Sequence, residues 1–218
     1  MIAFDHRGIR PIHYGMIHKP KTKRGEETQE KILRAAEDCF AEKGYFQTVI
    51  SDITNKADIA PGTFYIYFVD KLTVFRHLMT ELSHRLRSRI HVALEGCETR
   101  LQIEEQGARE FFKFVSEHTG LFRIVWDAQF VDQDAFKAYY EGFASAYARK
   151  LGEARDAGEV RDLDMTALSY SFIGIVNFVA LKYAVFDGGE VPESAIRTVV
   201  TLLETGAFIE SPDSMNRR

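Results

Sequence analysis

The segment Ile59-Ala-Pro-Gly-Thr-Phe-Tyr-Ile-Tyr-Phe-Val-Asp-Lys71 decides how this chain is interpreted. Proline is favoured at the first position of a helix, so a short helix is expected to begin at the proline of this segment. Phe64 and Phe68 lie four residues apart and share one face of that helix, which should pack inward. Gly62 and Ile66 then point roughly the other way.

The outward side of this short helix suits a nucleic-acid surface. Gly62 lets a backbone come close to whatever the helix approaches. The flanking hydroxyl groups can donate to phosphate oxygens, and the lysine that ends the segment adds a positive charge. The residues of this segment expected to contact DNA are Pro61, Gly62, Thr63, Tyr65, Tyr67 and Lys71.

A second short helix is expected immediately upstream, over residues 49–57, with Thr48 at its N-cap. The turn Asp58-Ile59-Ala60 joins the two helices, and aspartate tolerates the left-handed conformation that such a turn can need. Two short helices joined by a tight turn form the helix-turn-helix arrangement, whose second helix reads the major groove.

The pieces of this region stand at a characteristic spacing: Gly44-Tyr-Phe-Gln-Thr48, then Ile53 and Ala57, then Gly62-Thr-Phe-Tyr-x-Tyr-Phe68 with Lys71 and Phe75. Together they resemble the DNA-binding domain of the TetR/AcrR family of bacterial transcriptional regulators. The resemblance covers roughly residues 28–75. It implies an all-α chain, with an N-terminal three-helix helix-turn-helix domain followed by a larger helical ligand-binding and dimerisation domain.

A few positions depart from the family pattern. Asp58 stands where relatives usually have glycine, Ala60 where they often have serine, and Leu72 where an acidic residue is common. None of these changes removes a phosphate contact, but alanine cannot cap the third helix with its side chain. Ser51 sits where relatives often place a base-reading residue, so it joins Thr48 as an expected DNA contact, with its base preference left open.

The net charge of the 218-residue chain is −4, which alone argues against a nucleic-acid binder. The charge is unevenly distributed: residues 1–90 hold 15 Lys and Arg against 11 Asp and Glu, and residues 91–218 hold 13 against 21. A mildly basic first part and an acidic remainder fit a DNA-reading head on a body that faces away from phosphate. The hydrophobic content of 45% indicates a globular protein.

Four parts are expected along the chain: an N-terminal extension over residues 1–24, the helix-turn-helix domain over 25–72, the larger helical domain over 73–210, and a tail over 211–218. The first residues show no signal-peptide pattern, and Met16 offers a second start. The basic cluster that follows Met16 is either a solvated tail or an arm that follows the DNA backbone or minor groove.

No alternating strand pattern occurs, so the whole chain is interpreted as α-helical. An eighth helix, over about residues 165–186, is apolar nearly all round and should be buried on both sides, either inside its own domain or against a second subunit. The longest mostly apolar run, residues 167–181, is shorter than the ~20 residues that span a bilayer, so no membrane association is expected.

The larger domain is rich in aromatic residues. Core packing accounts for most of these rings, but so many large flat side chains also often line an apolar pocket. Asn177 on the eighth helix needs a polar partner, and Arg123 or His118 could meet a carboxylate. The expected ligand contacts are Phe112, Arg123, Trp126, Phe130, Tyr139, Phe143 and Asn177.

No cofactor and no metal site are expected. His77, His84 and His91 repeat every seven residues on the fourth helix, and each step moves roughly 10 Å along the axis, so they cannot share one ion. Cys39 and Cys97 belong to no C-x-x-C pattern and fit a reducing cytoplasm.

The resemblance implies a homodimer built from the last two helices, bound to a palindromic operator in double-stranded DNA. We interpret the chain as a ligand-responsive repressor that a small apolar or aromatic effector releases. One alternative is a ligand-independent DNA-binding protein of the same fold, with an architectural or cell-division role. The other is an enzyme using clustered carboxylates, but we interpret Asp132 and Asp134 as helix-start residues, and no nucleophile motif accompanies them.

Overall fold

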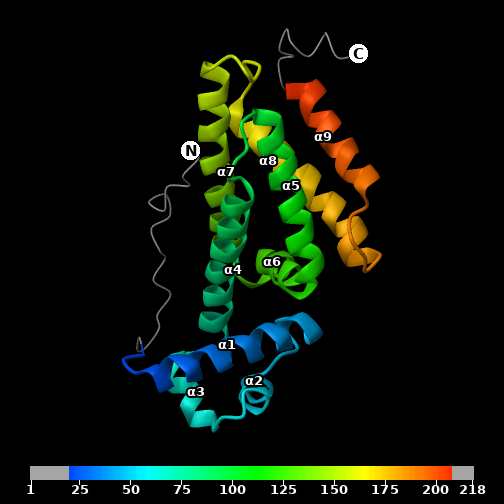
Figure 1. Cartoon of the computed structure of the whole chain (residues 1–218). Coiled ribbons are helices and arrows are strands. Elements are labelled where there is room, and N and C mark those ends of the chain that lie inside the picture. The colour runs from blue at the N-terminus through cyan, green and yellow to red at the C-terminus, as the bar shows by residue number, and fades with distance from the viewer. Residues whose placement is uncertain (1–19, 208–218) are drawn as a thin grey trace. The chain divides into compact units, whose positions relative to one another are not determined.

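A computed structural model describes residues 20–207 of the chain (Figure 1). Most of the expected N-terminal extension, the second start at Met16 and the whole C-terminal tail lie outside these residues. Within residues 20–207 the structure is built from helices and turns and contains no β-strand. The all-α prediction is therefore confirmed.

The order of the helices follows the sequence pattern closely. The helices are α1 (Lys23–Lys43), α2 (Ile50–Lys56), α3 (Pro61–Tyr67), α4 (Lys71–Ala93), α5 (Arg100–Glu117), α6 (Thr119–Val131), α7 (Gln133–Asp156), α8 (Met165–Ala180), the π-helical continuation η1 (Leu181–Phe186), and α9 (Glu193–Ala207).

The described residues divide into two compact units. The first unit holds residues 20–85 and 118–139, which include α1, α2, α3 and α6. The second unit holds residues 86–117 and 140–207, which include α5, α8, η1 and α9. The division falls inside α4 and α7, so these two helices each continue from one unit into the other. The first unit continues past residue 72, because α6 groups with α1, α2 and α3.

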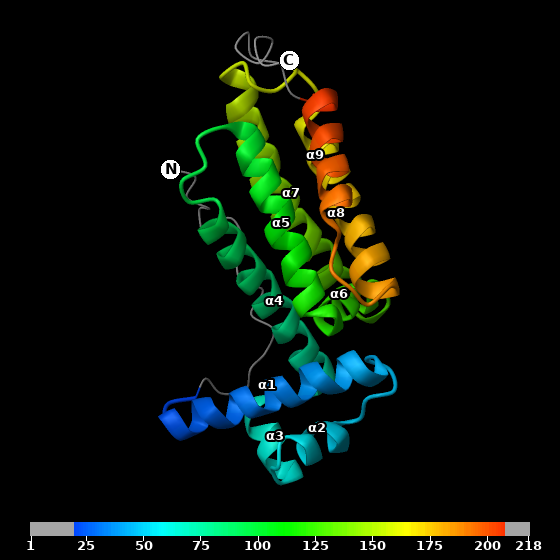
Figure 2. The same ribbon diagram turned by 45° about the vertical axis from the view of Figure 1, so that its right-hand side comes forward.

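In the first unit, α1 packs against α2, and α2 packs against α3, as both views of the ribbon show (Figures 1 and 2). The side chains of Phe40, Phe64, Phe68 and Phe75 are fully buried between these helices and α4. The ring of Phe75 lies edge-on to that of Phe40, with 5.7 Å between centroids. Each buried ring contributes roughly 1.5–3 kcal/mol of transfer free energy, which holds α1, α2 and α3 together as one body.

Two backbone turns set the directions of α2 and α3. Gly44 ends α1 with a positive φ of 78°, a conformation that glycine adopts without steric cost. Asp58 lies in the turn between α2 and α3 with a φ of 53°, so the expectation of a left-handed aspartate is confirmed.

A close contact joins α6 to α1 within the first unit. A Cβ atom placed on Gly120 would overlap the Cβ of Ala41, so the glycine is needed for this approach. The Arg123 guanidinium donates to the Ala41 carbonyl at 3.3 Å, and Asp127 accepts from the Tyr45 amide at 3.4 Å. We call these interactions the α1–α6 contact.

The start of α7 is fixed by Asp132, as expected. One of its carboxylate oxygens accepts from the Ala135 amide at 3.1 Å, in the manner of an N-cap. The other accepts from Arg76 of α4. Asp132, one of the carboxylates considered in the enzyme alternative, therefore has a structural role in the first unit.

In the second unit, α5 packs against α8, η1 and α9, and α8 also packs against α9 (Figure 2). Arg109 of α5 pairs with Glu193 at the start of α9, with two N–O distances of 2.6 Å. Phe172 of α8 and Leu203 of α9 are buried in this core.

The apolar helix from Met165 to Phe186 is 22 residues long, as expected, because η1 continues α8 without a break. Among residues 20–207, it is the one helix whose length and composition would allow it to cross a membrane. Only 28% of the most apolar stretch of this helix is buried inside the chain, and the Phe178 side chain is 64% exposed. The possibility that this helix is enclosed within its own domain is therefore wrong.

Candidate nucleic-acid interface

The short helix α3 presents the two faces that its sequence predicts. Ala60 is its N-cap residue and makes no side-chain cap bond, as expected for alanine, and Pro61 follows at the first helical position. Phe64 and Phe68 are fully buried on the inward face. Ile66 is exposed on the opposite face.

The predicted DNA contacts differ in how far they reach solvent. On α2 and α3 the exposed members are Ser51, Pro61, Gly62 and Tyr65. Thr63 and Tyr67 are half-buried at the sides of α3, which leaves part of each side chain accessible. We call these six residues, which carry hydroxyl, aromatic and small side chains, the α2–α3 surface.

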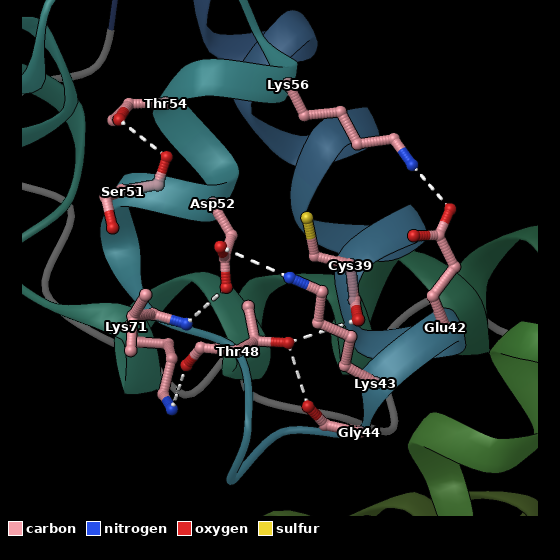
Figure 3. A network of polar contacts seen from close by, with 11 residues as sticks. Cys39, Glu42, Lys43, Gly44, Thr48, Ser51, Asp52, Thr54, Lys56 and Lys71 are labelled. Carbon is pink, nitrogen blue, oxygen red and sulfur yellow. Dashed lines mark hydrogen bonds and ion pairs between the residues drawn. The ribbon is translucent and has the colours of Figure 1, made fainter.

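Thr48 is not part of that surface. Its side chain is fully buried, and its hydroxyl lies 3.1 Å from the Cys39 carbonyl oxygen and 2.8 Å from that of Gly44 (Figure 3). The N-cap of α2 is Val49, whose amide donates to Asp52 at 3.0 Å. The expected capping role of Thr48 is therefore wrong, because its hydroxyl ties the loop to the end of α1 instead.

Lys71 is also turned toward the protein. Its ammonium group donates to the Tyr45 carbonyl at 2.7 Å and to the Thr48 carbonyl at 2.6 Å, and it lies 4.1 Å from the centre of the Tyr45 ring. Burial lowers the pKa of this ammonium group. Since an ammonium has three N–H donors, two of them brace the α1–α2 loop and one is left for a phosphate.

Two further lysines near the α2–α3 surface are held in ion pairs (Figure 3). Lys56 lies 2.6 Å from Glu42, and Lys43 lies 3.2 Å from Asp52. The amide of Val49 and the ammonium of Lys43 lower the pKa of the Asp52 carboxyl. The positive charges next to α2 are thus partly neutralised, and the surface depends on hydroxyl and apolar groups more than the sequence indicated.

Comparison with known proteins agrees with this geometry. Residues 32–78 match the model of bacterial regulatory proteins of the tetR family. Over most of its length, the chain is 25% identical to the uncharacterized HTH-type transcriptional regulator YdgC of Bacillus subtilis (strain 168), with 87% of this chain and 97% of that protein covered. This chain carries a DNA-binding domain of the TetR family.

Two other relatives of this chain are informative. The HTH-type transcriptional repressor BepR of Brucella suis biovar 1 (strain 1330) is 40% identical over 53 residues, which cover 24% of this chain and 25% of that protein. The crystallised FadR of Bacillus subtilis, in complex with stearoyl-CoA, has a TM-score of 0.73 at 20% identity, covering 82% of this chain and 98% of that one. At this identity the likeness to FadR shows the fold alone.

The curated relatives are named as transcriptional regulators. The chain is accordingly a DNA-binding transcriptional regulator and not an enzyme.

Replacing Lys71 by methionine tests its role in the α1–α2 loop. The variant Lys71→Met leaves two loop carbonyls without their charged donor, which should cost about 1–2 kcal/mol of unfolding free energy because the site is half-buried. Its salt slope for DNA binding should fall by about 0.9 if the third N–H holds one phosphate. Denaturant unfolding and binding at several salt concentrations measure both effects, with the exposed Lys113→Met as the control. Unchanged unfolding would contradict the bracing role.

Four of the predicted ligand contacts fall in the first unit. Trp126 packs against Phe122 with 6.1 Å between ring centroids, and Tyr139 is half-buried. Phe130, however, is 75% exposed, and Arg123 lies on the outside of α6 in the α1–α6 contact. The positions of Phe130 and Arg123 do not support the expectation that they line an apolar pocket, because both side chains point away from the buried face of α6.

The other three predicted ligand contacts fall in the second unit. Phe112 is buried on α5, and Phe143 of α7 lies under the Arg87 guanidinium, 4.5 Å from its ring centre. Asn177 is buried and donates to the Ile173 carbonyl at 2.7 Å, so its partner is a backbone group of its own helix.

A buried charged cluster in the second unit was missed by sequence analysis. Arg100 and Glu104 of α5 form an ion pair, and the hydroxyl of Tyr147 on α7 donates to the other oxygen of Glu104. The Nε–H of Arg100 is buried and has no hydrogen-bond partner among residues 20–207. Burial and the Glu104 carboxylate raise the pKa of Tyr147 well above its usual range. The sequence signal that could have indicated this cluster is an arginine and a glutamate four residues apart on an otherwise apolar helix face.

The histidines on α4 show no sign of acting together. Burial lowers the pKa of His77, whose ring lies edge-on to Phe68 at 6.1 Å, whereas His84 is exposed. Among residues 20–207, no group of three or more His, Cys, Asp or Glu side chains is placed to hold a metal ion.

Proposed function

We propose that this chain is a homodimeric repressor of the bacterial cytoplasm, which binds a palindromic operator and is released by a small apolar effector. The exposed apolar surface on α8 and α9 carries the proposal. Tyr170 and Phe178 of α8 and Leu202 of α9 are all exposed, although their helices pack side by side in the second unit.

A second copy of the chain is the occupant that best fits this surface. Gly174 lies between Tyr170 and Phe178, and a Cβ placed on it would meet no atom within 4 Å. A small residue between two large exposed rings allows another helix to cross closely. Stable homodimer interfaces have apolar cores of this kind, and burying such surface contributes about 25 cal/mol for each Å².

A symmetric dimer would explain how short recognition helices achieve specific binding. Two-fold symmetry presents one α3 from each subunit to successive major grooves, about 34 Å apart, on a palindromic site. Each α2–α3 surface is small, so the two half-sites must act together for tight binding. The similarity of the head to the repressor BepR supports repression as the regulatory outcome.

The chemistry of the second unit supports an apolar effector with a polar end. Buried rings, including Phe112 and Phe172, supply apolar surface, and the buried Nε–H of Arg100 has no hydrogen-bond partner within residues 20–207. A long acyl chain ending in a thioester or carboxylate combines both chemistries. FadR of Bacillus subtilis, which shares the fold, was crystallised with stearoyl-CoA, a molecule of this class.

The fold offers two covalent routes from effector to DNA. Both α4 and α7 continue from the second unit into the first, and the α1–α6 contact joins α6 to the DNA-binding helices. An effector changes DNA affinity only if it binds the DNA-incompetent state more tightly than the DNA-bound state. A coupling free energy of about 1–3 kcal/mol corresponds to roughly 5–150-fold weaker operator binding.

The test begins with a high-affinity duplex selected from random DNA by the full-length protein. Stearoyl-CoA is then added during an anisotropy titration, with free coenzyme A and stearate as separate controls. We expect the acyl thioester to weaken binding by roughly 5–150-fold and coenzyme A to have no effect. Affinity that no apolar compound changes would favour the alternative, a ligand-independent DNA-binding protein of the same fold.

A further inference from the structure

The outward face of α3 carries an apolar side chain where it would meet the bases. Successive residues of a helix are 100° apart, so Ile66 lies about 160° around the axis from both Phe64 and Phe68. Those two rings are fully buried, whereas Ile66 is 52% exposed. Gly62 lies one turn before Ile66 on the same outward face, and a Cβ there would meet no atom within 4 Å.

The chemistry of α3 restricts which bases it can read. Between Pro61 and Tyr67 the helix has no charged side chain and no amide side chain. It therefore lacks the Arg or Lys that reads guanine, the Asn or Gln that reads adenine, and the carboxylate that reads cytosine. Hydroxyl groups contact several bases without discriminating strongly among them, so the base feature that suits the apolar residue of this helix is the C5-methyl group of thymine.

The neighbouring residues favour the same partner. The hydroxyls of Thr63 and Tyr67 flank Ile66 and can bind phosphates, which fix position without reading sequence. Gly62 lets the helix backbone come close to the groove floor. Since Lys43 and Lys56 are held in ion pairs, the charges beside α2 do not dominate this surface.

From these observations we propose that Ile66 determines operator sequence by packing against the C5-methyl group of a thymine in each half-site. The inference rests on the DNA binding that the family match supports and on the proposed two-fold docking, and it is independent of effector response. It gives α3 a preference for thymine, whereas a serine or threonine hydroxyl can contact several bases.

The experiment deletes each partner of the contact separately and then both together. Each thymine of the selected duplex is replaced in turn by deoxyuridine, which removes only the methyl group and keeps base pairing. Dissociation constants are measured for the wild-type protein and for Ile66→Ala. Val69→Ala is the matched control, since Val69 is 51% exposed but lies beyond the end of α3.

We expect one thymine position in each half-site whose methyl deletion weakens wild-type binding by roughly fourfold, the effect of one buried methyl group. In Ile66→Ala, deletion of that same methyl should have no further effect, while Val69→Ala should keep the full fourfold loss. Thermal unfolding confirms that both variants fold, which is expected for exposed side chains.

Two results would overturn the inference. One is a selected duplex on which no methyl deletion changes the dissociation constant of the wild-type protein. The other is an Ile66→Ala variant that retains the wild-type methyl dependence. A failure to select any duplex is a third and distinct result, because it would refute DNA binding itself and the assigned role of Ile66 with it.

Discussion

The variant Phe178→Asp is expected to be monomeric at concentrations at which the wild-type protein is a dimer. The Phe178 ring is exposed on α8 in a single chain, and in the proposed dimer it becomes buried between subunits. Burying an unpaired carboxylate there would cost at least about 3 kcal/mol, which weakens self-association by more than roughly 100-fold. Sedimentation analysis over a range of protein concentrations measures this change.

A matched substitution separates the interface from general surface effects. Phe130 of α6 is 75% exposed, slightly more than Phe178, but it lies away from α8 and α9 in the chain and outside the second unit. Phe130→Asp should therefore remain dimeric and bind the operator normally. A dimeric Phe178→Asp would contradict the interface. A monomeric wild-type protein that instead binds lipid vesicles would identify the helix Met165–Phe186 as a membrane element.

The variant Gly120→Ala is expected to lose about 1–3 kcal/mol of unfolding free energy, although alanine normally favours helices. The added methyl group overlaps the Cβ of Ala41 at the α1–α6 contact, and the Ala41 Cα lies 3.6 Å away. The two helices must move apart, which should also weaken operator binding by disturbing the DNA-binding head. Denaturant unfolding and anisotropy measure these two effects.

Two companion variants make this prediction specific. Gly107→Ala on α5 adds the same methyl group where no atom lies within 4 Å, and it should stabilise the protein by roughly 0.5–1 kcal/mol. The double variant Ala41→Gly with Gly120→Ala removes the overlapping atom and should recover most of the lost stability. Equal effects of Gly120→Ala and Gly107→Ala would contradict the tight α1–α6 contact.

The fold of α1, α2 and α3 was predictable because the local sequence signals in these helices agree with one another. Pro61 marks the start of α3, the spacing of Phe64 and Phe68 marks its buried face, and Gly44 marks the end of α1. Each of these signals acts within one helical turn, so the sequence expresses it directly. The left-handed turn at Asp58 was predictable for the same reason.

The roles of Thr48 and Lys71 were not predictable in the same way. Both side chains bond to backbone carbonyls of the α1–α2 loop, and the positions of those carbonyls depend on how α1, α2 and α4 pack. The exposed position of Phe130 likewise depends on which face of α6 packs inward. Periodicity predicts which face of a helix is buried, but the burial of residues at the edge of that face depends on tertiary packing.

The apolar pattern of α8 shows a second limit. Its sequence indicated burial on both sides, and the single chain buries one side only. An apolar sequence pattern indicates that a surface is removed from water, but it does not identify what covers that surface. The same pattern suits a domain core, a second subunit or a bilayer.

The measurement that tests this account most directly is a native mass spectrum of the full-length protein bound to its selected operator duplex. We predict a complex of one duplex with two 24.9 kDa chains, and this stoichiometry should persist as the protein is diluted toward the dissociation constant of the protein–DNA complex. A complex of one duplex with a single chain, formed at the same affinity, would contradict the two-fold arrangement of α3 on DNA and with it the proposed dimeric repressor.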